Sequence, residues 1–159
     1  MVEVPILTHV LSVKIVLVRV PQLYLTKTGQ TTSYATGDDG DLGKGIAWPN
    51  PRFTDNLDGT ITDNLTGLIW LQDANCFGQK TWSEALSDCN GLASGACGLT
   101  DSSVAGDWRL PNYRELFSLV DVESYNPSLP SGHPFDNTQP DNYWSSTTLR
   151  HVMDVFWDV

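Results

Sequence analysis

Positive charge is scarce in this sequence. Its 159 residues carry nine Lys and Arg against nineteen Asp and Glu, which gives a formal net charge of −10. A surface of this sign repels nucleic-acid phosphate and anionic lipid headgroups, and no run of Lys and Arg offsets it locally. We therefore expect no nucleic-acid partner for this protein.

Long hydrophobic runs are also lacking. The most apolar stretch, 10-VLSVKIVLVRV-20, is shorter than the roughly 20 residues that span a bilayer, and it contains Lys14 and Arg19. It has no basic start and is followed by no small-x-small cleavage site, so it makes a poor signal peptide. We expect no membrane insertion, and we predict a strand here from the Val and Ile content.

Catalytic motifs are a third absence. The sequence contains no GxSxG, HExxH or P-loop pattern, and its three histidines share no partner motif. Cysteines are few, and Cys76, Cys89 and Cys97 form no CxxC and match no zinc-site spacing. One disulfide with one free thiol would favour an oxidising compartment, whereas three buried reduced thiols remain the alternative.

What the sequence does contain is typical of one globular domain. Apolar residues make up 40%, with six Trp. The pair Asp58-Gly59 predicts a hairpin turn, and the capping box of Thr81 and Glu84 predicts a helix start. The predicted order begins with a strand at 10–20, an irregular loop at 26–50, hairpin strands at 52–56 and 60–63, and a strand at 68–72. Helices at 82–93 and from after Pro111-Asn112 to near Asp121 follow, then a loop at 122–142 and strands at 143–148 and 152–159.

This order places the helices together between strands, which is typical of an α+β fold with long loops. Trp70, Trp82, Trp108 and Trp144 fall in apolar patterns and are expected mainly in the core. We expect Arg109 to pair internally with a carboxylate such as Glu115.

Several stretches of the sequence are similar to one known family. The runs 106-GDWRLPNYREL-116, 131-SGHPF-135 and 143-YWSSTT-148, with 30–76 and 80–101, resemble the DUF1566 family, also called the Lcl C-terminal domain family. The resemblance covers roughly residues 28–148. It implies a C-type-lectin-like fold, shared with formylglycine-generating enzymes and with variable proteins of diversity-generating retroelements.

In that fold two helices pack on small twisted antiparallel sheets, and the first strand pairs near the end of the chain. We therefore expect an N-terminal strand segment at 1–27 and a domain at 28–159. The resemblance further implies a secreted, cell-surface or periplasmic protein that binds a glycan or protein ligand in adhesion, is not an enzyme, and assembles as a homo-oligomer where avidity is needed. The alternatives are a structural module of a larger surface protein and a degenerate enzyme of the formylglycine-generating type.

The C-terminal segment departs from the family pattern. Family members continue past this point, so the chain looks truncated at the C-terminus, and 149-LRHVMDVFWD-158 replaces the usual polar residues. In retroelement-diversified proteins the adenines of AAC codons are replaced at random, and the resulting codons could encode most of these residues. Ordinary sequence drift is the competing explanation. The predicted ligand-binding residues are Trp144, Arg150, His151, Asp154 and Trp157.

Two further sites follow from the positions of acidic residues and cysteines. Aligning the 54–65 stretch as an EF-hand puts Thr54 and Leu65 at the anchoring positions, so an EF-hand is excluded. An irregular Ca²⁺ site of Asp55, Asp58 and Asp63 remains a candidate beside a plain hairpin with solvated carboxylates, and no other cofactor is expected.

Cys76 precedes the first predicted helix and Cys97 follows it, so a bridge between them would connect the two ends of that helix. We predict the disulfide Cys76–Cys97, with Cys89–Cys97 as its main competitor.

Overall fold

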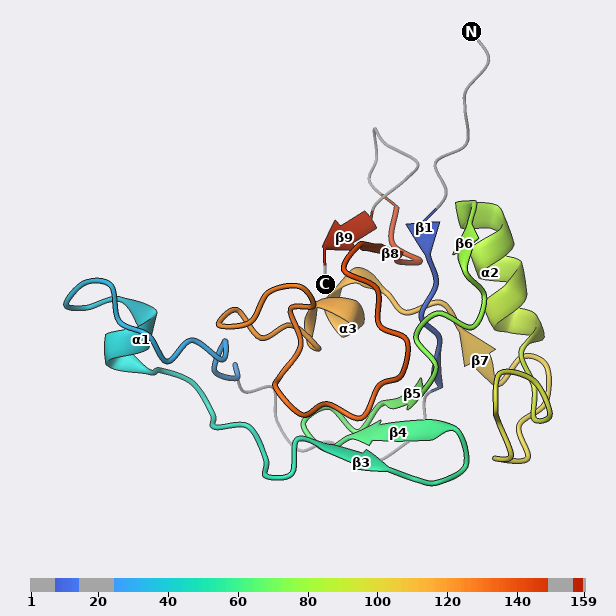
Figure 1. Ribbon diagram of the computed structural model, residues 1–159, viewed down its shortest axis with the longest axis horizontal. Helices are drawn as coiled ribbons and strands as arrows, with labels where there is room; N and C mark the ends of the chain where they lie inside the picture. The colour runs from blue at the N-terminus through green and yellow to red at the C-terminus, as the bar shows by residue number, and fades with distance from the viewer. Residues whose placement is uncertain (1–7, 15–24, 149–155, 159) are drawn as a thin grey trace, which may run out of the picture.

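The computed structural model describes residues 8–14, 25–148 and 156–158, and these form two small β-sheets with helices beside them (Figure 1). The expected α+β class is confirmed. No helix in the described ranges is long and apolar enough to cross a membrane. The elements are β1 (Thr8–His9), β2 (Val13–Lys14), α1 (Asp39–Leu42), β3 (Phe53–Asp55), β4 (Thr60–Asp63), β5 (Ile69–Leu71), β6 (Gln79–Lys80), α2 (Trp82–Gly91), β7 (Trp108–Arg109), α3 (Tyr113–Phe117), β8 (Asn142–Trp144) and β9 (Phe156–Asp158).

The first sheet joins the beginning of the described chain to its end. Its strand order is β6-β1-β8-β9, with β1 antiparallel to β6 but parallel to β8. His9 lies opposite Tyr143, and Trp157 lies opposite Tyr143 in the antiparallel pair β8–β9. The expectation of purely antiparallel sheets is therefore wrong for β1 and β8, because these strands are distant in sequence and no hairpin imposes their direction.

The second sheet has the order β3-β4-β5-β2-β7, and all its pairs are antiparallel. Val13 of β2 lies opposite both Trp70 and Arg109. Residues 10–12 connect β1 to β2, so one short segment crosses from the first sheet to the second (Figure 1). The strands within residues 8–14 thus pair in both sheets with strands of residues 28–159, the segment that the sequence predicts as the domain. Of the strand predicted at 10–20, residues 15–20 lie outside the described ranges.

Helix α2 begins where its sequence predicts. The Thr81 hydroxyl accepts a hydrogen bond from the Glu84 backbone N–H, and the Glu84 carboxylate accepts one from the Thr81 backbone N–H at 2.9 Å. This reciprocal capping satisfies two backbone donors that have no partner inside the helix. Ala85 and Cys89 form its buried face.

The other two helices differ from expectation. Helix α3 has the same kind of capping box at Asn112 and Glu115, but it ends at Phe117 rather than near Asp121. The Ser118 hydroxyl donates to the Glu115 carbonyl at 2.7 Å, and such local bonds compete with the helical ladder. Helix α1 lies in the stretch 26–50 for which the sequence predicts an irregular loop. Its N-cap Asp38 accepts from the Asp41 N–H, and Gly43 adopts a left-handed conformation at its end.

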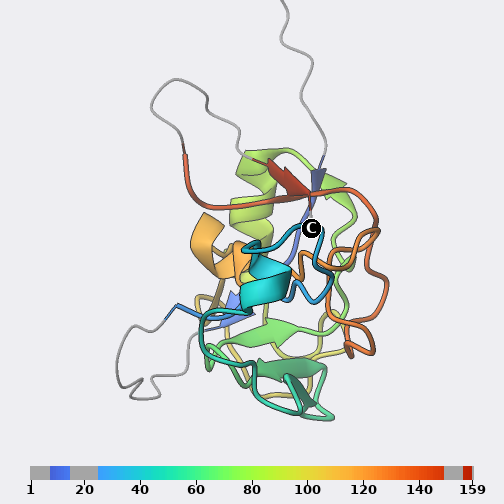
Figure 2. The same cartoon turned by 90° about the vertical axis from the view of Figure 1, so that its left-hand side faces the viewer.

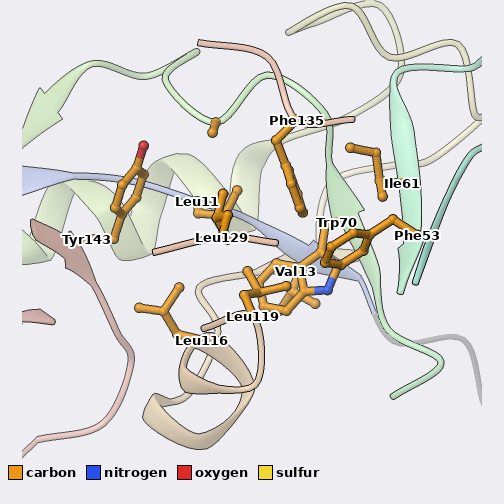
Figure 3. Close-up of a cluster of buried hydrophobic side chains, with 11 residues drawn as sticks. Leu11, Val13, Phe53, Ile61, Trp70, Leu116, Leu119, Leu129, Phe135 and Tyr143 are labelled. Carbon is orange, nitrogen blue, oxygen red and sulfur yellow. The ribbon is translucent and has the colours of Figure 1, made fainter. Parts of the chain in front are cut away.

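The core consists of three buried clusters, one beside α3 and two beside α2, and Trp70, Trp108 and Trp144 are each at most 1% exposed. Figure 3 shows the largest cluster, in which Val13 and Trp70 of the second sheet gather with Leu119, just after α3. The tryptophans expected in the core are confirmed there, except that Trp82 is only partly buried.

A buried ion pair connects the second sheet to α3. The Arg52 guanidinium donates to both carboxylate oxygens of Asp63, at 2.8 and 3.0 Å, and to the Ser118 carbonyl at 2.9 Å. Asp63 is 0% exposed and Arg52 is 8% exposed. Bidentate geometry compensates for the cost of burying both charges, so the pair fixes the β4–β5 turn against the end of α3.

Candidate functional site

An open, polar cleft of about 390 Å³ lies where the β3–β4 hairpin, the chain after β5 and residues 136–137 meet. We call it the acidic cleft, because three carboxylates and two amides line it. Leu57 stands at the same surface and is 87% exposed. The polar lining residues are Asp55, Gln72, Asp73, Asp136 and Asn137.

One wall of the acidic cleft is the hairpin turn that the sequence predicts. Gly59 has φ +83°, a conformation that favours glycine, and the Asp58 carboxylate accepts from the Thr60 N–H at 3.0 Å. The Thr100 N–H donates to the Asp58 carbonyl at 2.8 Å, and the Gln72 N–H donates to the Gly59 carbonyl at 2.9 Å. The turn is therefore held against two other segments and is not a free loop tip.

The disulfide forms part of the same wall. Cys76 and Cys97 are bonded, with Cα atoms 5.6 Å apart, and Cys97 lines the acidic cleft. The predicted pairing is confirmed. Cys89 is free and buried, and its sulfur accepts a hydrogen bond from the Ser12 hydroxyl at 2.9 Å. Burial raises the pKa of the Cys89 thiol to about 12, so it stays protonated and unreactive at neutral pH.

The opposite wall brings together residues that are distant in sequence. The Ala74 N–H donates to the Asp136 carbonyl, and the Asp136 N–H donates to the Gln72 carbonyl, both at 2.9 Å. The Asn137 amide donates to the Asp73 carboxylate at 3.0 Å. Asp73 and Asp136 are thus paired in an isolated parallel backbone bridge, and both residues line the acidic cleft.

No basic side chain of the described ranges forms an ion pair with Asp55, Asp73 or Asp136. The Asp55 carboxylate accepts from the Leu57 N–H at 2.8 Å with one oxygen and from the Gln72 side-chain amide at 3.4 Å with the other. Both bonds of the Asp73 carboxylate, from the Asn75 N–H and the Asn137 amide, go to a single oxygen. The acidic cleft therefore presents to solvent negative charge that no cation of the described ranges compensates. Such a surface suits ligands that bring donors, namely hydroxyl or ammonium groups.

The irregular Ca²⁺ site of Asp55, Asp58 and Asp63 does not form. Asp63 is fully buried, and its carboxylate binds Arg52, Thr66 and the Leu65 N–H. The Asp58 carboxylate is occupied by Thr60. Across the described part of the chain, no group of three or more His, Cys, Asp and Glu side chains is arranged to hold a metal ion.

The C-terminal candidates divide into three cases. Trp144 is 1% exposed, and its indole N–H donates to the Lys80 carbonyl at 2.9 Å. Its assignment to a binding surface is corrected, because a side chain packed between β8 and α2 offers a ligand no area. Trp157 belongs to β9, at the edge of the first sheet. The candidates Arg150, His151 and Asp154 lie outside the described residues.

The two candidate surfaces lie at opposite ends of the molecule. In Figure 1 and in the perpendicular view of Figure 2, β9 is at the top and the β3–β4 hairpin is at the bottom. Of the polar residues that line the acidic cleft, only Asp55 is a candidate from the sequence. No local signal marks 72-QD-73 and 136-DN-137 as neighbours, because the backbone bridge between them joins Asp73 to a residue 63 positions later, Asp136.

The model of the Lcl C-terminal domain family matches residues 59–159, which is more than half of the chain and includes most of the acidic cleft. No curated protein and no solved structure matched the chain.

Proposed function

Because this chain belongs to the Lcl C-terminal domain family, we propose that it is a ligand-binding domain of a surface protein and that it catalyses no reaction. The Cys76–Cys97 disulfide supports a secreted, cell-surface or periplasmic location, since such bonds persist in oxidising compartments. We also propose that its fold is C-type-lectin-like, as the family resemblance implies.

The acidic cleft is the observation that carries this proposal. Three carboxylates without a cationic partner in the described ranges face an open hollow whose walls are held by a disulfide and by paired backbone. A glycan is the ligand class that fits best, because its hydroxyls donate to carboxylate and amide oxygens while Leu57 offers an apolar contact. A protein ligand bearing Lys side chains would satisfy the same acceptors and is the second candidate.

The C-terminal strand is the alternative location for the ligand. Trp157 is on edge strand β9, and Arg150, His151 and Asp154 precede it in the sequence. Trp and Arg are favoured at binding hot spots, so this surface is tested in parallel. Assembly into a homo-oligomer would raise the avidity of either surface.

The test is a screen of the purified full chain on an array of glycans, followed by calorimetric titration of each hit. We expect Asp136→Asn and Asp73→Asn each to weaken binding by about tenfold, the effect of losing a charged hydrogen-bond partner. The matched control Asp88→Asn, on α2, removes the same charge from an ion pair with Lys80 of β6 and should change affinity little.

Other results have defined meanings. Loss of binding in Trp157→Ala, with Asp136→Asn unaffected, would move the ligand to the C-terminal strand. The absence of any glycan hit, together with binding of a Lys-rich peptide, would favour a protein ligand. No binding of either class would leave the structural-module alternative. The degenerate-enzyme alternative requires a reactive thiol, and the bonded Cys76–Cys97 pair and the buried Cys89 both argue against it.

A further inference from the structure

A second hollow, of about 310 Å³, lies between residues 25–28, Trp48 and the end of α3. We call it the apolar groove. Leu25, Phe117, Val120 and Val122 line it together with the Trp48 ring. Its volume is at the lower end of the range of about 300–1,000 Å³ that is usual for sites of small ligands.

The apolar side chains of this groove are unusually exposed. Leu25 is 86% exposed, Phe117 is 50% exposed and Val122 is 49% exposed. Leaving such a side chain in water forgoes about 1.5–3 kcal/mol that full burial would supply. A contiguous exposed apolar surface of this kind is typical of a binding site.

The charges around the apolar groove are the opposite of those of the whole molecule. Lys27 and Arg114 line it, and none of its lining residues is acidic, although the chain carries nineteen Asp and Glu. Seven Lys and Arg lie in the described ranges, and four of them, Lys14, Arg52, Lys80 and Arg109, are in ion pairs. The three that are not are Lys27 and Arg114 of the groove and Lys44 outside it.

The nearby acids are already engaged. Glu123 accepts from the backbone of Thr31 and Thr32 at 2.9 and 3.0 Å, and Asp39 accepts from the Thr28 hydroxyl at 2.5 Å. Asp121, between the lining residues Val120 and Val122, accepts from the Glu123 N–H at 3.0 Å. None of these acids is in an ion pair with Lys27 or Arg114 within the described ranges. The positive charge of Lys27 and Arg114 is therefore available to an anionic ligand.

The groove is formed before any ligand arrives. The Trp48 indole N–H donates to the Lys27 carbonyl at 2.9 Å, and the Lys27 N–H donates to the Ile46 carbonyl at 3.0 Å. The guanidinium carbon of Arg52 lies 4.8 Å from the Trp48 ring centroid, so the ring is fixed from a second side. A wall that is already ordered adds little entropic cost to binding.

We propose that the apolar groove binds an aliphatic carboxylate, with the head group at Arg114 and Lys27 and the tail along Leu25, Phe117 and Val122. The volume favours a small amphiphile over a protein partner, which would need about 800 Å² of contact surface on this chain. This site is separate from the acidic cleft, so the proposal does not rest on the proposed function.

The first test titrates the full chain with sodium octanoate by calorimetry, beside 1-octanol and octyltrimethylammonium at the same concentrations. Octanoate should bind saturably with a stoichiometry of one. The neutral alcohol should bind about tenfold more weakly, because it lacks the charged hydrogen bond, and the cation should not bind. Equal binding of octanoate and octanol, or no saturable binding of octanoate, overturns the proposal.

The second test uses variants, each checked for folding by circular dichroism. Arg114→Gln should weaken octanoate binding by about tenfold and leave octanol unchanged. Phe117→Ser should weaken both, and Val122→Ser replaces it if Phe117→Ser does not fold. The control Lys44→Gln removes a cation outside the groove, and Asp136→Asn tests the acidic cleft, so both should bind octanoate normally.

Two results would assign the groove to a different occupant. If the wild type is a dimer that Phe117→Ser converts to a monomer, the groove is an interface between copies of this chain. If Phe117→Ser and Val122→Ser lower stability as core substitutions do, by about 2–5 kcal/mol, another part of the chain covers the groove. Either result overturns the proposal.

Discussion

Gly59 stands at the point where the β3–β4 turn meets the disulfide loop. A Cβ atom there would lie 2.5 Å from the Gly98 carbonyl oxygen, and φ is +83°. We expect Gly59→Ala to lower the free energy of unfolding by about 1–3 kcal/mol, because both strain and a backbone clash oppose it. Urea denaturation measures the change.

The matched control for this substitution is Gly95→Ala. Gly95 has φ +94°, but a Cβ there would meet nothing within 4 Å. It bears the cost of the positive φ without the clash, so it should lose less stability than Gly59→Ala. Equal losses would mean that the close approach to Gly98 is unimportant.

The buried thiol of Cys89 makes the stability of the folded state depend on pH. Its pKa is raised by burial to about 12 from an ordinary value of 9.0, so the folded state keeps a proton that the unfolded state loses above pH 9. Stability is therefore fully present below pH 9 and falls as pH rises towards 12, by up to about 1.4 kcal/mol per pH unit from this group.

The measurement is urea denaturation at several values between pH 8 and pH 11. Cys89→Ala should flatten the alkaline slope relative to the wild type. A slope remains in the variant because burial also raises the pKa of Tyr143, which acts in the same direction. The same slope in both proteins would contradict the role given to Cys89.

At the scale of elements, the disulfide and the capping box act on the two ends of α2. The bond closes a loop with a sequence separation of 21, which corresponds to about 3 kcal/mol in the chain-entropy model. We expect the double variant Cys76→Ser/Cys97→Ser to lose about that much free energy of unfolding. The measurement is urea denaturation of the variant and of the oxidised wild type.

Two comparisons identify the source of this loss. A reducing agent should destabilise Cys89→Ala, which retains only the bonded pair, by about as much as the double variant loses relative to the wild type. Thr81→Ala removes the cap alone and should cost about 1 kcal/mol. If reduction leaves the stability of Cys89→Ala unchanged, the disulfide does not stabilise the folded state.

At the scale of the whole molecule, the excess of negative charge opposes folding. A charge of −10 repels itself in the compact state, and the acidic cleft concentrates three carboxylates that no cation of the described ranges neutralises. Screening shortens the range of this repulsion, from about 30 Å at 0.01 M salt to about 3 Å at 1 M. We expect the melting temperature to rise with NaCl concentration.

Calorimetric melting at increasing NaCl concentrations checks this expectation. The double variant Asp73→Asn/Asp136→Asn should show a smaller rise than the wild type, because part of the repulsion is gone. A melting temperature that falls with NaCl would show instead that attractive ion pairs, such as Lys80–Asp88, dominate the electrostatics.

The sequence by itself determined the turns, helix caps and ion pairs that form between residues close together in the chain. The turn at Asp58-Gly59, the capping box of Thr81 and Glu84 and the pairing of Arg109 with Glu115, at 2.8 Å, are all contacts within a few residues. Each is encoded by the spacing of two side chains and forms wherever the backbone permits. The Cys76–Cys97 pairing follows from the positions of the cysteines on either side of α2, but the bond is not a local contact. The helix is about 15 Å long, so the segments before and after it fold back to bring the two Cα atoms to 5.6 Å.

Only the tertiary structure decided which polar residues are buried and which are exposed together. Asp63 and Asp55 are both acidic residues of the same predicted hairpin. In the structure Asp63 is buried in an ion pair with Arg52, whereas Asp55 lines the acidic cleft. The parallel pairing of β1 with β8 and the meeting of Asp73 with Asp136 likewise join distant segments. Such contacts depend on the packing of the whole chain, because no local spacing of residues specifies which distant strands come together.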